Sequence, residues 1–323
     1  MVRRAPKPPP PETQASPAPA DPGQRPTAAD AGLGFEKWMG FLSSFVAPLT
    51  LVTALLFYFG YVSTREFFRY FGVDVDIVGL SSQEFVMRSP GALFIPVMVL
   101  TLLAAAAILG HRALRKWLLT QERPAQRRVV GILAWTGIGF ILAGLALAFL
   151  VPFFPSWAYG QLLTPLFLAI GAGLAAYAAA TVRALSPTGG GRGVVVLLVL
   201  VMIAGTFWST ATIAQWWGLG QARTLAADLT TLPAVVLDTR ERLYPGNDDI
   251  TFQALGDEAS ADDPAVAQMF GYRYFGLRLL AQGGGRLYLV PDAWSPDAST
   301  LVVPYDDVRV RFRFVPDADP PTP

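Results

Sequence analysis

Cysteine is absent from this chain of 323 residues, and histidine occurs once, at His111. Without cysteine the chain forms no disulfide, no catalytic thiolate and no Cys-ligated zinc or iron–sulfur site. A single histidine also effectively excludes histidine-cluster metal sites and Ser-His-Asp triads. The sequence offers no set of catalytic, cofactor-binding or metal-binding residues, so we expect a protein that is not an enzyme.

Charge is scarce as well. Asp, Glu, Lys and Arg make up 15% of the chain, against about 25% in soluble proteins, and hydrophobic residues make up 53%. The formal net charge is +1, but residues 222–323 carry 15 acidic and 9 basic side chains. We therefore expect a lipid bilayer, and no nucleic acid, as a partner.

Five long apolar runs fill the first two-thirds of the chain, and no Asp, Glu, Lys or Arg interrupts them. Each run holds about 20 residues, enough for a helix to cross the roughly 30 Å hydrocarbon core of a bilayer. The predicted spans are 40–61, 92–110, 129–149, 161–182 and 193–213. We expect an α-helical polytopic membrane protein whose five transmembrane helices lie in a domain at 34–215.

Basic residues set the predicted orientation, because loops rich in Lys and Arg stay in the cytoplasm. The connections after the second and fourth spans hold Arg112, Arg115, Lys116, Arg123, Arg127, Arg128, Arg183 and Arg192. Residues 1–33, with nine prolines, predict a disordered cytoplasmic tail. With five spans, residues 216–323 are then expected outside the plasma membrane. The excess of Arg over Lys in the sequence is typical of a high-GC bacterium, so we expect a bacterial plasma membrane.

Small residues recur at four-residue spacing in the third and fourth spans. They are Gly139 with Ala143, and Gly171 with Ala175 and Ala179. Such residues let helix backbones approach closely. The pattern predicts that these two spans pack on each other, and a homo-oligomer interface is the alternative.

Residues 216–323 predict a small α+β extracytoplasmic domain with disordered last few residues. The fifth span should continue as a helix to about Leu229. Strand-like runs cover 234–237, 250–255, 272–281, 286–290, 301–303 and 308–315. Gly283, Gly284 and Gly285 predict a hairpin turn between the third and fourth of these runs.

The last strand-like run alternates apolar residues with arginine. Val308, Val310, Phe312 and Phe314 should face the core, and Arg309, Arg311 and Arg313 should face solvent. The arginines suit an anionic ligand, or they form a solvated face that discourages aggregation. Three acidic pairs, Asp248-Asp249, Asp257-Glu258 and Asp262-Asp263, lie in predicted solvated loops.

The first outer loop, residues 63–91, begins with aromatic side chains. The segment 63–71 predicts a short helix in the headgroup plane, or else a lipid-facing groove. Asp74-Val75-Asp76 follows. In membrane glycosyltransferases, such a pair of carboxylates binds a divalent cation or acts as the general base. The alternation of the two acids with Val73, Val75 and Ile77 also fits a short strand.

Several stretches together resemble uncharacterised five-span membrane proteins of high-GC Gram-positive bacteria. They are Tyr70-Phe71-Gly72-Val73, residues 81–89, residues 272–280, Tyr288-Leu289-Val290-Pro291 and Trp294. The resemblance implies the same five-span layout with an outer domain. It brings no activity, ligand or site residue.

The leading hypothesis is a non-enzymatic integral membrane protein that presents its outer domain to a protein partner or an anionic envelope ligand. An oligomeric transporter or channel subunit is the alternative, and Thr206, Ser209, Thr210 and Thr212 are its best support. A glycosyltransferase-like enzyme using Asp74 and Asp76 is the second alternative. Gly189–Gly191 lack the lysine of a phosphate-binding loop.

Overall fold

The computed structural model describes residues 28–120, 123–154, 157, 159–185, 192–245, 249–255, 270–295 and 297–313. The chain divides into two units, 1–52 and 53–323. Within the described residues, the first unit holds the beginning of helix α1 (Ala28–Tyr70), and every contact reported below lies in the second. The predicted tail falls outside the described residues except for 28–33, which belong to α1.

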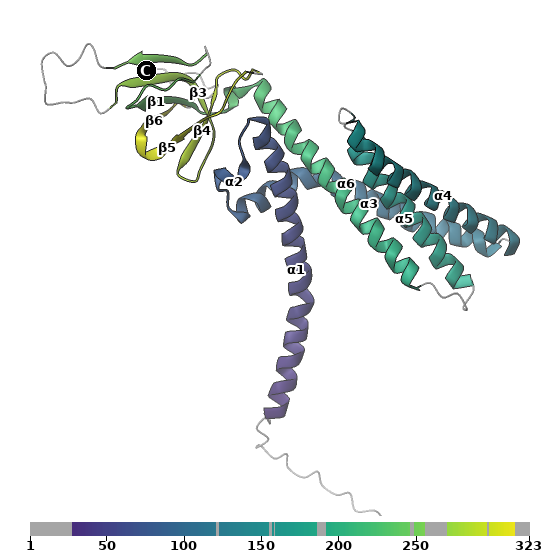
Figure 1. Cartoon of the computed structure of the whole chain (residues 1–323). Helices are drawn as coiled ribbons and strands as arrows, with labels where there is room; N and C mark the ends of the chain where they lie inside the picture. The colour runs from purple at the N-terminus through teal and green to yellow at the C-terminus, as the bar shows by residue number, and fades with distance from the viewer. Residues whose placement is uncertain are drawn as a thin grey trace, which may run out of the picture. The chain divides into compact units, whose positions relative to one another are not determined.

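Four helices are long and apolar enough to cross a membrane, within the part of the chain that the structure describes. They are α3 (Ser82–Thr120), α4 (Arg123–Leu150), α5 (Gly160–Leu185) and α6 (Arg192–Ala227) (Figure 1). These helices contain the second to fifth predicted spans and indicate a membrane protein. The first predicted span, 40–61, lies within α1, and its crossing of the membrane stays a prediction.

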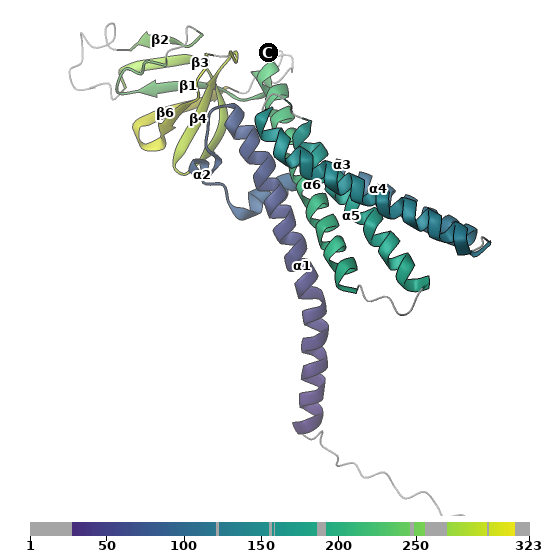
Figure 2. The ribbon, with the colours of Figure 1, turned by 45° about the vertical axis from the view of Figure 1, so that its right-hand side comes forward.

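Helices α4 and α5 pack on each other, as the small residues predicted, and α6 packs on α5 (Figure 2). Gly171 lies on Gly137 and Ile141, and a methyl group at Gly137 would clash with the backbone of Ala175. The prediction for Gly139 is wrong, because this residue is exposed with no neighbour near its Cα hydrogens. The contact face instead contains Gly137, Ile141 and Gly144, which follow the spacing of one helix face.

The end of α1 crosses α3 and α6 at two glycines. A Cβ atom at Gly60 would overlap the carbonyl oxygen of Phe85 in α3, and one at Gly218 in α6 would overlap that of Ser63. Residues 63–70 are helical as predicted, but they continue α1 instead of forming a separate helix in the membrane plane. The two crossings hold the ends of three helices together.

Six antiparallel strands form one sheet, which confirms the six strand-like runs. They are β1 (Ala234–Thr239), β2 (Thr251–Ala254), β3 (Tyr272–Gly283), β4 (Arg286–Pro291), β5 (Leu301–Pro304) and β6 (Val308–Arg313). The strand order is β5-β4-β3-β1-β6, and β2 also pairs with β3. Gly284 and Gly285 have φ angles of 57° and 74°, so the predicted glycine hairpin joins β3 to β4.

Both faces of β4 are buried, which explains its nearly continuous apolar sequence. Leu287 and Leu289 pack with Val235, Leu237 and Leu277 in the core of the sheet. On the opposite face, Tyr288 packs with Phe68 and Val78, and Val290 packs with Phe71. The sheet is therefore covered on that side by the loop between α1 and α3.

Short helical turns complete the fold. They are α2 (Val75–Val78), η1 (Val151–Phe153), η2 (Leu229–Thr231) and η3 (Tyr305–Asp307). α6 ends at Ala227, and its Ala222 lies in the same buried cluster as Leu229 of η2. This cluster also contains Val290 of β4, so it joins the end of α6 to the sheet domain.

Candidate functional site

The loop between α1 and α3 is shaped by local hydrogen bonds and two glycines. Gly72 and Gly79 take φ angles of 72° and 71°, which favour glycine. Ser81 and Glu84 form a capping box at the start of α3: the Ser81 N–H donates to Glu84 Oε2 at 2.6 Å, and the Glu84 N–H donates to Ser81 Oγ at 3.3 Å.

The two aspartates of the D-x-D sequence both make contacts inside this loop. Asp74 caps α2, with its Oδ1 accepting from the Asp76 N–H at 3.1 Å. The Tyr61 hydroxyl donates to Asp76 at 3.3 Å. The predicted strand over Val73, Val75 and Ile77 is wrong, because an aspartate cap starts a helical turn here. Within the described residues, no three His, Cys, Asp or Glu side chains lie grouped for a metal ion.

The sheet domain docks on the main chain of this loop through two hydrogen bonds. Tyr288 Oη donates to the Ile77 carbonyl at 2.9 Å, and Thr300 Oγ1 donates to the Phe71 carbonyl at 2.6 Å. Burial raises the pKa of the Tyr288 hydroxyl, so it remains a proton donor at neutral pH. Each of these hydrogen bonds contributes about 1 kcal/mol. The docking therefore depends more on burial of the rings around Phe68 and Phe71 than on the two bonds.

An open cleft of about 690 Å³ lies where the loop meets the sheet domain. Its wall is partly aromatic: Trp294 packs edge-on against Phe71 with ring centroids 4.9 Å apart, and Tyr70 lies 6.4 Å from Trp294. Ser295, Ser299 and Thr300 complete the lining on the sheet side. Apolar rings beside a few polar groups are typical of ligand sites.

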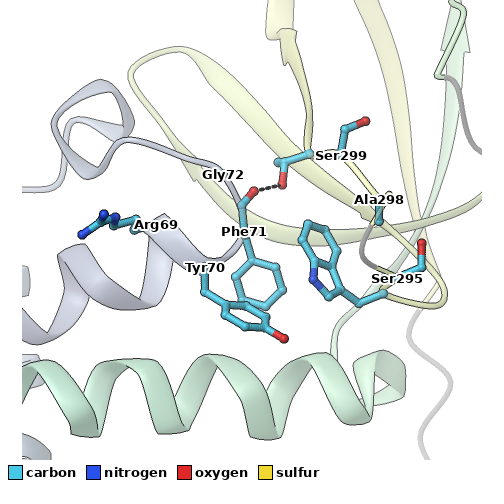
Figure 3. A pocket seen from close by; sticks show the side chains of 9 residues that line it. Arg69, Tyr70, Phe71, Gly72, Ser295, Ala298 and Ser299 are labelled. Carbon is cyan, nitrogen blue, oxygen red and sulfur yellow. Dashed lines mark hydrogen bonds between the residues drawn. The ribbon is translucent and has the colours of Figure 1, made fainter. Parts of the chain in front are cut away.

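Basic side chains border the cleft. Figure 3 shows Arg69 pointing away from the rings of Tyr70 and Phe71. Arg69 also lines a second hollow of about 310 Å³, together with Arg65 and Asp74. Arg65 and Arg69 lie on one face of α1, one turn apart, and both are exposed. The 3.5 Å ion pair of Arg69 with Glu66 is a weak surface pair, so the guanidinium groups remain accessible to an anion.

The arginine stripe on β6 has a structural role in part. Asp238 on β1 is buried, and its carboxylate binds Arg273 Nε at 2.8 Å and an Arg311 nitrogen at 2.8 Å. Val308 and Val310 pack against the sheet core as predicted, but Phe312 is 53% exposed, so its predicted core position is wrong. Arg313 and Phe314 have no described side-chain environment.

The other predicted residues do not gather with the cleft. Thr206, Ser209, Thr210 and Thr212 each donate a hydrogen bond to the carbonyl four residues earlier in α6. Of the three acidic pairs, only Asp249 lies in the described residues. The polar hydroxyls are thus bonded to their own helix.

No protein family model, curated protein or solved structure matches this chain. What the cleft can bind therefore follows from its own residues. Sequence reasoning gave Tyr70 and Phe71 to an interfacial helix or a lipid-facing groove, and it singled out Trp294 without a role. It missed Asp238 as an ion-pair centre, although a lone acid directly after an apolar strand-like run was a usable signal.

Proposed function

We propose that this chain is a non-enzymatic protein of the bacterial plasma membrane that binds a partner or an anionic envelope ligand outside the cell. The cleft between the α1–α3 loop and the sheet domain carries this proposal. The rings of Tyr70 and Trp294 offer apolar surface, Ser295 and Ser299 offer hydroxyl groups, and Arg69 offers a guanidinium for a phosphate or carboxylate at the border of the cleft, pointing away from the rings (Figure 3). Within the described residues, the D-x-D acids belong to no group of three acidic or histidine side chains that could hold a metal ion. Thr206, Ser209 and Thr210 of α6 line a separate groove, with their hydroxyls bonded to their own helix.

Five spans and an outward sheet domain are part of the proposal. The end of α1, the start of α3 and the end of α6 meet at the glycine crossings, and Tyr159 before α5 packs edge-on against Trp216 of α6 with ring centroids 6.0 Å apart. These contacts suit four antiparallel helices, α3 to α6, in which the start of α3 and the end of α6 lie on the same side of the membrane. If α1 also crosses, the tail lies on the opposite side, where the loop arginines favour the cytoplasm.

Cysteine labelling tests this topology, since the chain has no cysteine of its own. An impermeant maleimide should label Asp297→Cys in intact cells, and it should label Thr120→Cys and Ser16→Cys only after the membrane is opened. Labelling of Thr120→Cys in intact cells would reverse the orientation. Labelling of Ser16→Cys in intact cells, while Thr120→Cys stays unlabelled, would show that the first predicted span does not cross the membrane.

Site-specific photocrosslinking tests the cleft in living cells. A benzoyl-phenylalanine replacing Ser299 should give a discrete crosslinked product, whereas the same group replacing the exposed Asp306, outside the cleft, should not. Arg69→Gln should weaken the product about tenfold, as expected for loss of a charge-assisted hydrogen bond of about 1.4 kcal/mol. Protease or glycosidase sensitivity of the product identifies its class. Equal products at Ser299 and Asp306 would contradict the proposal.

A further inference from the structure

A long apolar groove separates α3 from α5 and α6. Its volume is about 750 Å³, within the range of small-molecule sites. Along α3 it runs from Ile95 to Leu114, and along α5 from Leu166 to Tyr177. At 1.5 Å per residue, the α3 side is about 28 Å long, close to the roughly 30 Å thickness of a hydrocarbon core. The groove therefore extends through most of the depth of a bilayer.

One end of the groove is polar. His111 Nδ1 lies 2.9 Å from the Tyr177 hydroxyl, with the two rings perpendicular. His111 is the one histidine of the chain, and both residues line the groove. Arg115 is four residues beyond His111, so it lies on the same face of α3 one turn further on. The polar end thus combines an imidazole, a phenol and a guanidinium.

The charge around this end is strongly positive. Residues 107–133 hold six Lys or Arg and one acid, Glu122. Arg183 near the end of α5 and Arg192 at the start of α6 add two more positive charges. An occupant of the groove should therefore be apolar along most of its length and negatively charged at this end.

We propose that the groove binds an anionic phospholipid, with its acyl chains along α3 and α5 and its phosphate at His111, Tyr177 and Arg115. Basic pockets between transmembrane helices suit anionic headgroups. The apolar lining of the groove favours acyl chains, and the positive charge at one end favours an acidic headgroup.

Native mass spectrometry of the full-length protein in detergent tests the acyl-chain part. Phosphatidylglycerol should be retained at least tenfold more strongly than phosphatidylcholine with the same chains. Ala107→Trp fills the groove and should abolish this retention. Ala106→Trp is the matched control, because Ala106 is the neighbouring exposed residue and does not line the groove; it should retain the lipid.

A second pair of variants tests the headgroup part. Arg115→Gln should lower phosphatidylglycerol affinity about fivefold, the effect of one basic residue near an anionic lipid. Arg128→Gln removes the same charge from α4 and should change affinity less than twofold. Equal retention of the two lipids, or unchanged retention in Ala107→Trp, overturns the proposal. A change of oligomeric mass in Ala107→Trp without loss of lipid would assign the groove to a second copy of the chain.

Discussion

Alanine at Gly218 is expected to lower the melting temperature of the detergent-solubilised protein by about 6–12 °C. The new Cβ would overlap the carbonyl oxygen of Ser63 and lie 2.7 Å from its carbonyl carbon. Backbone atoms cannot move aside as a side chain end can, so α1 and α6 must separate. Overpacking of this kind costs about 3 kcal/mol, and about 1 kcal/mol corresponds to 2–4 °C in a chain of this size class.

Gly220 supplies the matched control in the same helix. It has no neighbour within 4 Å of a built Cβ, so Gly220→Ala should stabilise α6 by about 0.5–1 kcal/mol through helix propensity. Thermal unfolding of both variants in one detergent gives the comparison, and Trp217, directly before Gly218, reports the local packing by its fluorescence. Similar shifts for the two alanines would contradict the close crossing of α1 and α6.

Asp238→Asn is expected to destabilise the sheet domain by about 2–4 kcal/mol. The Asp238 side chain is 4% exposed and bridges Arg273 on β3 and Arg311 on β6. Removing one member of a buried ion cluster leaves uncompensated charge and costs about 3–5 kcal/mol, reduced here because Arg311 is half exposed. Faster hydrogen exchange of the β1, β3 and β6 amides in the full-length protein would measure the loss.

The pH dependence of Asp238 follows from its pKa. Burial raises the pKa of this carboxyl, but hydrogen bonds from Arg273 and Arg311 outweigh that effect and leave it below its usual value. Its contribution to stability is therefore complete above the unfolded pKa of about 3.9 and is lost as the pH falls through the folded pKa. The difference between wild type and Asp238→Asn should shrink below about pH 4.

Asp292→Asn is the control for this variant. Asp292 pairs with Arg278 at 2.8 Å, but its side chain is 49% exposed, so its loss should cost less than about 1 kcal/mol. If Asp292→Asn and Asp238→Asn have equal effects on hydrogen exchange, the buried ion cluster does not stabilise the sheet as described.

Local patterns predicted the elements well because their signals lie within a few residues. Alternation in β6 predicted a strand, and the glycines of the β3–β4 turn predicted the hairpin. The D-x-D segment failed for a local reason too. Alternation suggested a strand, but the side chain of Asp74 satisfies a backbone N–H and starts a helical turn instead.

The cleft was beyond prediction because its walls come from distant parts of the chain. Thr300 and Phe71 are 229 positions apart, and Tyr288 and Ile77 are 211 apart. No periodicity relates such residues, and aromatic residues beside a predicted membrane span are ordinarily explained by the interface. Only the docking of the sheet on the loop turns them into one site.

The same distance has a consequence for biosynthesis. Phe71 leaves the ribosome 229 residues before Thr300, which at about 5–20 residues per second is a delay of roughly 10–45 s. During that interval Phe68 and Phe71 have no sheet to cover them. The apolar loop stays uncovered until the last part of the chain has been synthesised. At this stage of assembly a chaperone or the lipid surface has the largest exposed apolar area to cover.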